Sequence, residues 1–423
     1  MLSYKPRIAD KLLEFRLRAT GAVLIEGAKW CGKTTTAARC AKSCLYMADA
    51  DNLEQNLAAA DLKPSLLLAG DVPRLLDEWQ IAPKLWDAVR FTVDQRGDAG
   101  QFILTGSAVP ADKSKILHSG TGRFSWLRMR PMSLFESGES SGEVSLARLF
   151  SGSSDILGIN PLSIQDLAFL TCRGGWPQAA SLGKEEALFV ANNYAEGVIH
   201  SDMSRVDGIK RDPSRIRKLL RVYARHQGTQ ASAGMLIKDM AKEDNPLSEN
   251  TVLSYLSALR SIFVIEEANA WNPNVRSATT VRTSPTRYFV DPSIAAAALG
   301  LSPDMLMADL RTFGFLFETL CIRDLRVYAE SIGGEVSHFR TKGNLECDAV
   351  VHLRNGKYGL VEIKLGGETA INHGVETLKE VESQLDTKTM GEPSFLMVLS
   401  GADRYAYRRT DGVLVVPVGT LRD

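Results

Sequence analysis

The sequence lacks an excess of charge of either sign. Its 50 lysine and arginine residues are balanced by 50 aspartate and glutamate residues, so the formal net charge at pH 7 is zero. A protein without a net field is not drawn as a whole to nucleic acid or to an acidic lipid surface. Binding of DNA would therefore need a local patch, and we expect no membrane partner.

Paired cysteines and long apolar runs are also missing. The six cysteines form no Cys-x-x-Cys pair and no regular spacing, so nothing indicates a zinc site or a disulfide framework. No apolar run approaches the ~20 residues needed to cross a bilayer, and the N-terminal "MLSYKPRIADKLLEF" lacks the apolar core of a signal peptide. We therefore expect a cytoplasmic protein, and its 423 residues predict two to four domains.

A glycine-rich stretch follows the first apolar run of the chain. The run "AVLIE" is typical of a buried parallel strand, and "GAKWCGKTTTA" leads into a helix. Gly27, Gly32, Lys33 and Thr34 satisfy G-x-x-x-x-G-K-T, in which the glycines let backbone N–H groups face phosphate oxygens. Lys33 would reach the β- and γ-phosphates of ATP, and Thr34 would ligate Mg²⁺. A glycine turn before a core helix is the alternative.

The loop and the first turn of its helix define the predicted nucleotide site. Its residues are Gly27, Ala28, Lys29, Trp30, Cys31, Gly32, Lys33, Thr34 and Thr35.

Two further apolar runs end in polar residues. The stretch "PRLLDEWQ" carries Asp77 and Glu78, as expected where a strand delivers one acid to the Mg²⁺ shell and a second acid to the attacking water. We predict that Asp77 binds the metal through water and that Glu78 is the general base. An acidic strand end followed by a helix cap is the alternative. The stretch "GQFILTGSA" ends near Ser107, which could read the γ-phosphate or hold the water.

An arginine further along the chain could complete the site. Arg123 follows a Gly-Thr-Gly turn and could supply a cation to the γ-phosphate, in the same subunit or in a neighbour. A solvated strand arginine is equally compatible with the pattern. Parallel strands joined by helices predict a doubly wound sheet with the nucleotide at the carboxyl ends of the strands.

The order of these motifs resembles a known family. "PRIADKLLEF", "GAKWCGKTTTA", "LLDEWQIAPKLWDAVR", "ILTGSA", "GTGR" and "MRPMSLFE" are similar to stretches of the bacterial and archaeal AAA-type ATPases that carry a C-terminal domain of unknown function. "RGGWPQAA" and "ANNYAEGVIHSDMSRV" extend the resemblance over nearly the whole chain. It implies ATP hydrolysis with Mg²⁺, an arginine finger at Arg123 and a sensor at Ser107.

The middle of the chain reads as helical. We predict a helical lid over residues 161–206, with a plain linker bundle as the alternative. Three helices and later strand-like runs over residues 207–300 suggest a winged helix, a fold that often binds DNA. Arg217, Arg221 and Arg225 recur every four residues and form a basic stripe that could follow phosphates. A solvated face, or a winged helix that packs against a second subunit, remains open.

The C-terminal part holds a second group of chemically active residues. Asp348 lies on one predicted strand, and Glu362 and Lys364, two apart, share one face of the next strand. This pattern resembles the D…E-x-K signature of the restriction-endonuclease-like fold, with Glu318 in place of its helical acid, and implies Mg²⁺-dependent cleavage of phosphodiesters. A structural ion pair between Lys364 and Asp348 is the alternative.

The sequence therefore predicts an α/β protein of four parts. A P-loop NTPase domain with a doubly wound parallel sheet covers residues 1–160, a helical lid 161–206, a winged-helix-like domain 207–300, and a mixed α/β nuclease-like domain 301–423. The predicted ligands are ATP and Mg²⁺, and the predicted partners are DNA and a second copy of the chain. A nucleotide-switched binding protein with an inactive nuclease-like domain is the alternative function.

Overall fold

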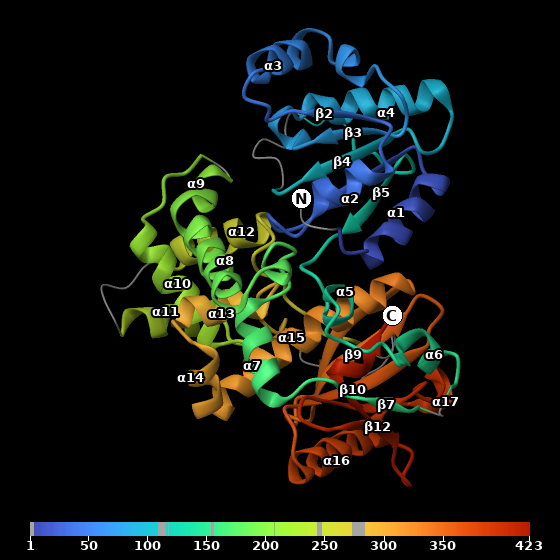
Figure 1. Cartoon of the computed structure of the whole chain (residues 1–423), viewed down its shortest axis with the longest axis vertical. Coiled ribbons are helices and arrows are strands. Elements are labelled where there is room, and N and C mark those ends of the chain that lie inside the picture. Colours follow the sequence, from blue (N-terminus) through green and yellow to red (C-terminus); the bar gives the residue numbers. More distant parts are fainter. Residues whose placement is uncertain are drawn as a thin grey trace.

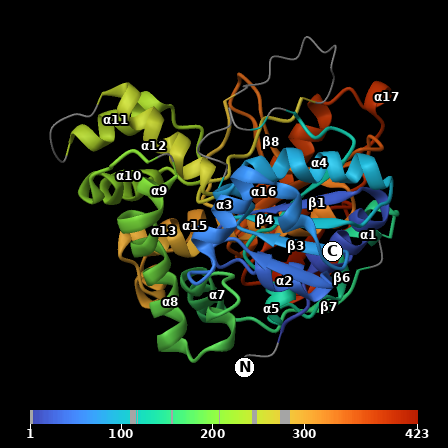
Figure 2. The ribbon, with the colours of Figure 1, turned by 90° about the horizontal axis from the view of Figure 1, so that it is seen from above.

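The computed structural model describes residues 4–108, 116, 118–153, 156–206, 208–242, 248–272 and 284–423. The chain forms an N-terminal sheet with its helices, a helical middle part and a C-terminal sheet, which lie at the top, lower left and lower right of Figure 1. Seen from above, the N-terminal part lies over the C-terminal part, and the middle helices lie to one side (Figure 2).

The N-terminal sheet is parallel throughout, in the order β2-β3-β4-β1-β5. Its strands are β1 (Ala22–Glu26), β2 (Ser43–Tyr46), β3 (Arg74–Asp77), β4 (Phe102–Gly106) and β5 (Phe124–Arg128). The helices are α1 (Ile8–Ala19), α2 (Lys33–Cys40), α3 (Leu53–Leu62) and α4 (Lys84–Arg96).

Helices cover both faces of this sheet. Successive residues of a strand point to opposite faces, so Val23 and Ile25 pack with α1 and α2, while Ala22 and Leu24 pack with α3 and α4. Apolar runs buried on both sides are typical of a doubly wound parallel sheet. The predicted P-loop NTPase architecture of the N-terminal part is confirmed.

The middle part is helical. Its elements are α7 (Ile164–Arg173), α8 (Lys184–Gly197), a π-helical turn (Val198–Asp202), α9 (Met203–Arg205), α10 (Pro213–Arg225), α11 (Ala233–Ala241), α12 (Glu249–Ser261), α13 (Pro292–Leu299) and α14 (Pro303–Ala308). Isolated antiparallel bridges join Ile265 to Phe289, Ala268 to Thr286 and Thr229 to Arg287. The helix starts follow the sequence signals, because Asp212 and Ser248 accept backbone hydrogen bonds as N-caps.

The C-terminal sheet is mixed and seven-stranded, in the order β7-β12-β13-β11-β10-β9-β8. The elements after the middle part are α15 (Leu310–Ser331), β8 (Gly334–Arg340), β9 (Glu346–Leu353), β10 (Tyr358–Lys364), α16 (Glu368–Gln384), α17 (Thr387–Met390), β11 (Leu396–Ser400), β12 (Tyr405–Arg408), β13 (Leu414–Pro417) and β14 (Leu421–Arg422). Strands β8, β9 and β10 form an antiparallel meander, and β11 pairs parallel to β10.

The segment after the N-terminal sheet is shared with the C-terminal sheet. It contains α5 (Leu134–Ser137), β6 (Val144–Ser145), α6 (Leu146–Phe150) and β7 (Gly158–Ile159). Strand β7 pairs with β12, and β6 pairs with β14. These short strands of the segment predicted as the end of the N-terminal domain thus pair with C-terminal strands.

No helix among the residues that the structure describes combines the length and the apolar character needed to span a bilayer.

Candidate nucleotide site

The phosphate loop joins the carboxyl end of β1 to the start of α2. Gly27 is required by close approach, because a Cβ atom there would lie 1.9 Å from the carbonyl oxygen of Met129. Gly32 has a φ of 104°, which disfavours a residue with a side chain. Lys33 Nζ donates to the carbonyl oxygens of Gly27 and Ala28, at 2.9 and 2.8 Å. The lysine therefore lies folded under its own loop.

A cavity of about 740 Å³ opens beside the loop. Some of its lining residues had been assigned to the site from the sequence: Lys29, Trp30, Gly32, Lys33, Thr34, Thr35, Glu78 and Ser107. The sequence patterns missed the others, which include Tyr4, Lys5 and Arg7 from the N-terminal segment and Pro177, Gln178 and Ser181 from the middle part. Pro177 and Gln178 belong to the "RGGWPQAA" stretch, which had been noted only for its family resemblance. Gly27, Ala28 and Cys31 are not among the lining residues.

The acids at the end of β3 lie beside the loop. Thr34 Oγ1 donates to Asp77 Oδ1 at 2.7 Å, and Thr105 Oγ1 donates to the same oxygen at 2.5 Å. A hydroxyl and a carboxylate in contact are oxygen ligands of the kind that Mg²⁺ prefers. Thr34 and Asp77 thus fit a magnesium ion bound together with nucleotide.

Glu78 lies next to Asp77 in a left-handed conformation, with a φ of 54°. Its Oε2 accepts a hydrogen bond from Ser107 Oγ at 3.1 Å and a shorter one from the side-chain amide of Gln80. Strands β3 and β4 are neighbours, so their carboxyl ends deliver Glu78 and Ser107 to the same side of the cavity. Ser107 contacts the carboxylate of Glu78 here.

Arg123 lies away from this cavity. It precedes β5, at the amino end of the parallel sheet, whereas the phosphate loop follows the carboxyl end of β1. Its guanidinium bonds Asp94 of α4 at 2.7 Å and the carbonyl oxygen of Thr121 at 3.0 Å. The structure therefore does not bring Arg123 to the nucleotide cavity of its own subunit, and action on a neighbouring subunit stays a prediction.

Side chains of the phosphate loop contact the helical middle part. Lys29 Nζ lies 2.5 Å from Asp202 Oδ1, at the end of the π-helical turn. The Trp30 ring lies 6.1 Å from that of Tyr194, which stacks on Trp176 at 4.0 Å. The loop that would enclose phosphate is thus attached directly to α8 and to the turn after it.

The C-terminal acids are neutralised by protein groups. Lys364 Nζ lies 2.5 Å from Glu362 Oε2 and 3.3 Å from Asp348 Oδ2, which also accepts from the Ile363 N–H. Glu318 of α15 accepts a hydrogen bond from the Tyr288 hydroxyl at 2.5 Å.

Burial governs the ionisation of these groups. Burial and the charge of Asp348 raise the pKa of Glu362 to about 8, and the same two causes hold the pKa of Glu318 well above its ordinary value. Burial lowers the pKa of Lys364, but the charges of Asp348 and Glu362 outweigh it and raise that pKa above the usual range. The cluster thus holds one lysine paired with two acids.

No group of three or more histidine, cysteine, aspartate or glutamate side chains is arranged to hold a metal ion within the described part of the chain. Asp348 and Glu362 do line an open cavity of about 430 Å³ with Glu346, His373 and Glu380. In this arrangement Lys364 contacts both Asp348 and Glu362, and Tyr288 contacts Glu318.

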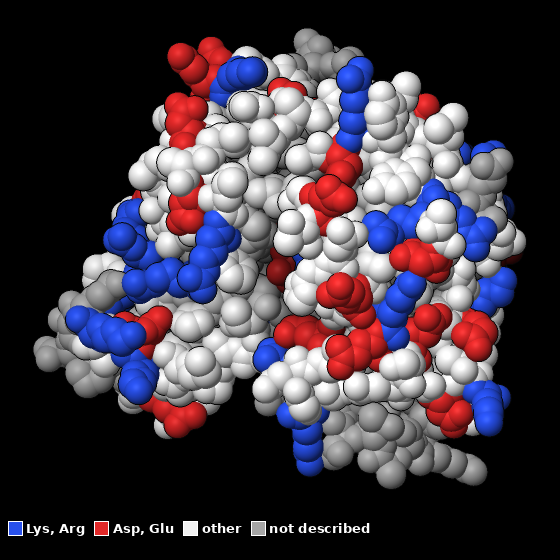
Figure 3. Space-filling view, turned by 90° about the horizontal axis from the view of Figure 1, so that it is seen from below, with Lys and Arg blue, Asp and Glu red and all other residues white. Residues whose placement is uncertain are grey.

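The predicted basic stripe lies on α10. Arg217, Arg221 and Arg225 are exposed, and basic side chains gather over the helical part at the left of Figure 3. Arg217 is paired with Glu196, with N···O distances of 2.6 and 2.7 Å. One member of the stripe is thus already bound to an acid.

Comparison with known proteins agrees with the N-terminal site. Family profiles match an AAA domain over residues 19–137 and two domains of unknown function, DUF8612 over 164–305 and DUF4143 over 313–421. Uncharacterized proteins from Mycobacterium bovis and Mycobacterium tuberculosis are each 23% identical over 376 residues, covering 88% of this chain and 76% of theirs. A Walker-type ATPase of Pyrococcus abyssi is 13% identical, with a TM-score of 0.42 over 68% of this chain and 94% of that one.

The residues that match the AAA domain include the phosphate loop and its neighbouring acids, Asp77 and Glu78. A phosphate loop after a parallel strand, with an aspartate and a glutamate at the end of a nearby strand, is the arrangement of a P-loop ATPase. Residues 19–137 therefore form a AAA-type P-loop ATPase domain.

Proposed function

We propose that this protein binds ATP in the cavity beside the phosphate loop and hydrolyses it. The observation that carries the proposal is that Lys33, Thr34 and Glu78 line one cavity although they come from two different strand ends. ATP would displace Lys33 from the carbonyl oxygens of Gly27 and Ala28, and the ammonium would then pair with the phosphates. Thr34 and Asp77 would hold Mg²⁺, which neutralises phosphate charge when bound.

Glu78 is the proposed general base. A carboxylate at the cavity wall would accept a proton from the attacking water, while Ser107 and Gln80 keep its Oε2 in place. Ser107 then acts by holding Glu78, in addition to the γ-phosphate contact predicted from sequence. Arg123 enters this proposal only as a residue offered to a second copy of the chain.

Contacts of the loop with the middle part suggest that nucleotide binding is transmitted. Lys29 and Trp30 lie on the loop, where Lys29 contacts Asp202 and Trp30 contacts Tyr194 of α8. A change in the conformation of the loop would therefore move α8. Binding and hydrolysis of ATP would then change the position of the helical middle part.

Two substitutions test the ATPase proposal. Lys33→Ala removes the phosphate-binding ammonium, and we expect ATP affinity to fall at least tenfold, measured by titration calorimetry with Mg²⁺ present. Glu78→Gln keeps the shape of the site, and we expect it to bind ATP while phosphate release falls about 100-fold or more. An unsubstituted protein without measurable affinity for ATP at millimolar concentration would refute the proposal. Equal rates of phosphate release from Glu78→Gln and from the unsubstituted protein would refute the role of Glu78.

A nuclease-like activity of the C-terminal part is the second candidate. The order α15-β8-β9-β10-α16-β11, with Asp348 on β9 and Glu362 and Lys364 on β10, supports it, because it places an acid pair and a lysine together on two neighbouring strands. The paired state of the acids opposes it, as do Glu346 and Glu380 in the same cavity, since acids repel phosphate. DNA binding without cleavage is the related alternative.

DNA cleavage and DNA-stimulated phosphate release distinguish these alternatives. Cleavage of plasmid DNA with Mg²⁺ that Asp348→Ala abolishes and Lys33→Ala spares would establish the nuclease. If the unsubstituted protein leaves DNA intact but DNA stimulates its phosphate release, the C-terminal part binds DNA without cutting it. Release unaffected by DNA would instead favour a switch for a protein partner or a second copy.

A further inference from the structure

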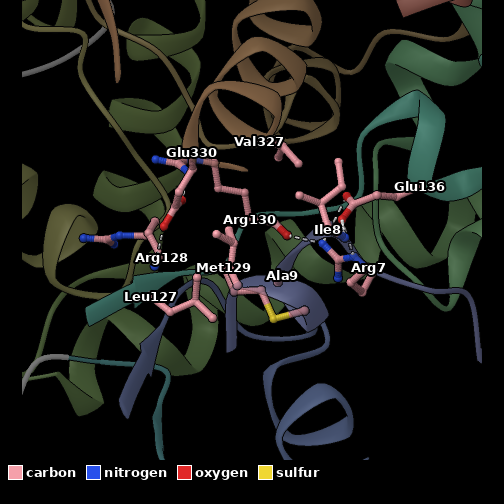
Figure 4. Close-up of a pocket in the computed structure, with 11 residues that line it drawn as sticks. Arg7, Ile8, Ala9, Leu127, Arg128, Met129, Arg130, Glu136, Val327 and Glu330 are labelled. Atoms are coloured by element: carbon pink, nitrogen blue, oxygen red, sulfur yellow. Dashed lines mark hydrogen bonds and ion pairs between the residues drawn. The ribbon is translucent and has the colours of Figure 1, made fainter. Parts of the chain in front are cut away.

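We propose that Arg7 is a positioning residue for the ATPase reaction, which holds the phosphate loop so that its backbone can bind phosphate. The inference rests on the proposed ATP function. Arg7 lies before α1, far from the loop in sequence, and only 6% of its surface is exposed. Figure 4 shows its guanidinium beside Glu136, with Arg130 on its other side.

The contact with Cys31 sets the direction of a loop peptide. Arg7 Nη1 donates to the carbonyl oxygen of Cys31 at 2.6 Å. In a planar trans peptide the C=O and the following N–H point in opposite directions. Holding the Cys31 carbonyl on the Arg7 side therefore turns the N–H of Gly32 the other way. That amide directly precedes Lys33, where a phosphate-binding loop needs its donors.

The guanidinium also lies directly against Gly32. A Cβ atom at this position would be 3.2 Å from Arg7 Nη1, so the glycine leaves room for the arginine as well as for a left-handed backbone. Arg7 lines the nucleotide cavity and also a small cavity between α1, the end of β5 and α15. It is thus a wall of the site whose polar atoms face the loop backbone.

Three further contacts hold the guanidinium itself. Nη2 donates to the carbonyl oxygen of Arg130 at 2.8 Å and to Glu136 Oε2 at 3.4 Å, and Nε donates to Glu136 Oε1 at 3.0 Å. The side chains of the Arg7–Glu136 pair are 4% and 1% exposed, and Glu136 is fixed by the N–H groups of Ile8 and Ser133. Several directed bonds from one planar guanidinium match an arginine, whereas a lysine offers a point charge.

The same pair links the loop to the C-terminal part. Glu136 belongs to α5, whose first N–H, that of Leu134, donates to Asp324 of α15 at 2.9 Å. The orientation of the loop is therefore tied to the long helix that begins the C-terminal domain.

The experiment compares Arg7→Ala with Arg74→Ala. Arg74 is a matched control, because it donates to the carbonyl oxygen of Leu67 at 2.9 Å in the same domain, at the end of β3 opposite to Asp77. We expect Arg7→Ala to raise the Kd and the KM for ATP about 10- to 100-fold, the effect of losing a charged hydrogen bond. Millimolar guanidinium should restore much of the affinity. Arg74→Ala should lower the melting temperature but leave the Kd and the KM for ATP unchanged, and added guanidinium should not alter its affinity for ATP.

A second variant covers loss of folding. If Arg7→Ala leaves Glu136 unpaired and does not fold, Arg7→Met combined with Glu136→Gln removes both charges together. Weak ATP binding by this folded double variant, or partial rescue in Arg7→Lys, supports the inference. ATP constants equal to those of the unsubstituted protein overturn it. Absence of ATP binding by the unsubstituted protein overturns the proposed function itself, a result distinct from the previous one.

Discussion

At the scale of single residues, the conformation of Glu78 separates the two acids of the site. Asp77 ends β3 as an ordinary strand residue, whereas Glu78 has a positive φ, which costs a residue with a side chain about 1–3 kcal/mol. The cost is met by contacts of its carboxylate with Ser107 and Gln80. The kink turns Glu78 into the cavity while Asp77 stays with Thr34, so neighbouring acids take different roles.

A buried aspartate makes stability depend on pH. Asp324 is fully buried beside Arg323, at 2.7 Å, and accepts from the Leu134 N–H. Burial raises its pKa to about 6, although Arg323 opposes the shift and the charge of Glu136 adds to it. The folded state therefore holds this proton more tightly than the unfolded state, whose pKa is about 3.8.

The sign of the effect follows from that difference. Stability from the protonated carboxyl is complete below pH 4 and is lost as pH rises to about 6, by up to about 3 kcal/mol. We expect the melting temperature of the unsubstituted protein to fall over this window relative to that of Asp324→Asn, whatever the absolute stability of either. Parallel pH curves for the two proteins, measured by circular dichroism, would show that Asp324 does not titrate there.

At the scale of elements, the sequence predicted strands and helices whose signals are local. Strands β1, β3 and β4 were visible as short apolar runs that lead to Gly27, Asp77 and Ser107. Helices α10 and α12 were visible from their N-cap residues. Strands β6 and β7 were not, because two residues carry no periodicity.

The parts of the site that the sequence did not predict depend on contacts over long sequence distances. Arg7 reaches Cys31 and Glu136 only in the folded chain, and no spacing rule joins them. Arg123 was placed by its neighbourhood in sequence, but strand direction puts it at the other edge of the sheet. Local patterns therefore found the phosphate loop and the acids, and missed the groups that orient them.

The junction of β5 with α15 gives an element-scale prediction. Arg130, just beyond β5, pairs with Glu266 at 2.6 Å and with Glu330 of α15 at 2.9 Å. Arg130→Met would leave both glutamates without this partner in a mostly buried place, and we expect the free energy of unfolding to fall by about 3–5 kcal/mol in urea titrations. Arg90→Ala, which breaks an i,i+4 pair on α4, should cost about 0.5 kcal/mol or less. Equal effects would mean that the junction does not stabilise the fold.

At the scale of the whole molecule, the C-terminal sheet is completed from far upstream. Residues 313–421 match a domain family, yet β7 forms the edge of this sheet and β6 pairs with β14. We expect a fragment of residues 313–423 to lack a cooperative melting transition, and a fragment of residues 132–423 to show one. Both are compared by circular dichroism and calorimetry. A cooperative transition of the shorter fragment at the same temperature would show that the upstream strands are dispensable.

The pairing of β6 with β14 has a consequence for the newborn chain. A ribosome adds about 5–20 residues per second, and residues 405–422 follow the segment 144–159 by some 260 positions. For tens of seconds, then, that segment would emerge without its partner strands and present unsatisfied backbone to chaperones. The nucleotide-binding part could fold early, while its attachment to the rest of the protein waits until residues 405–422 have been synthesised.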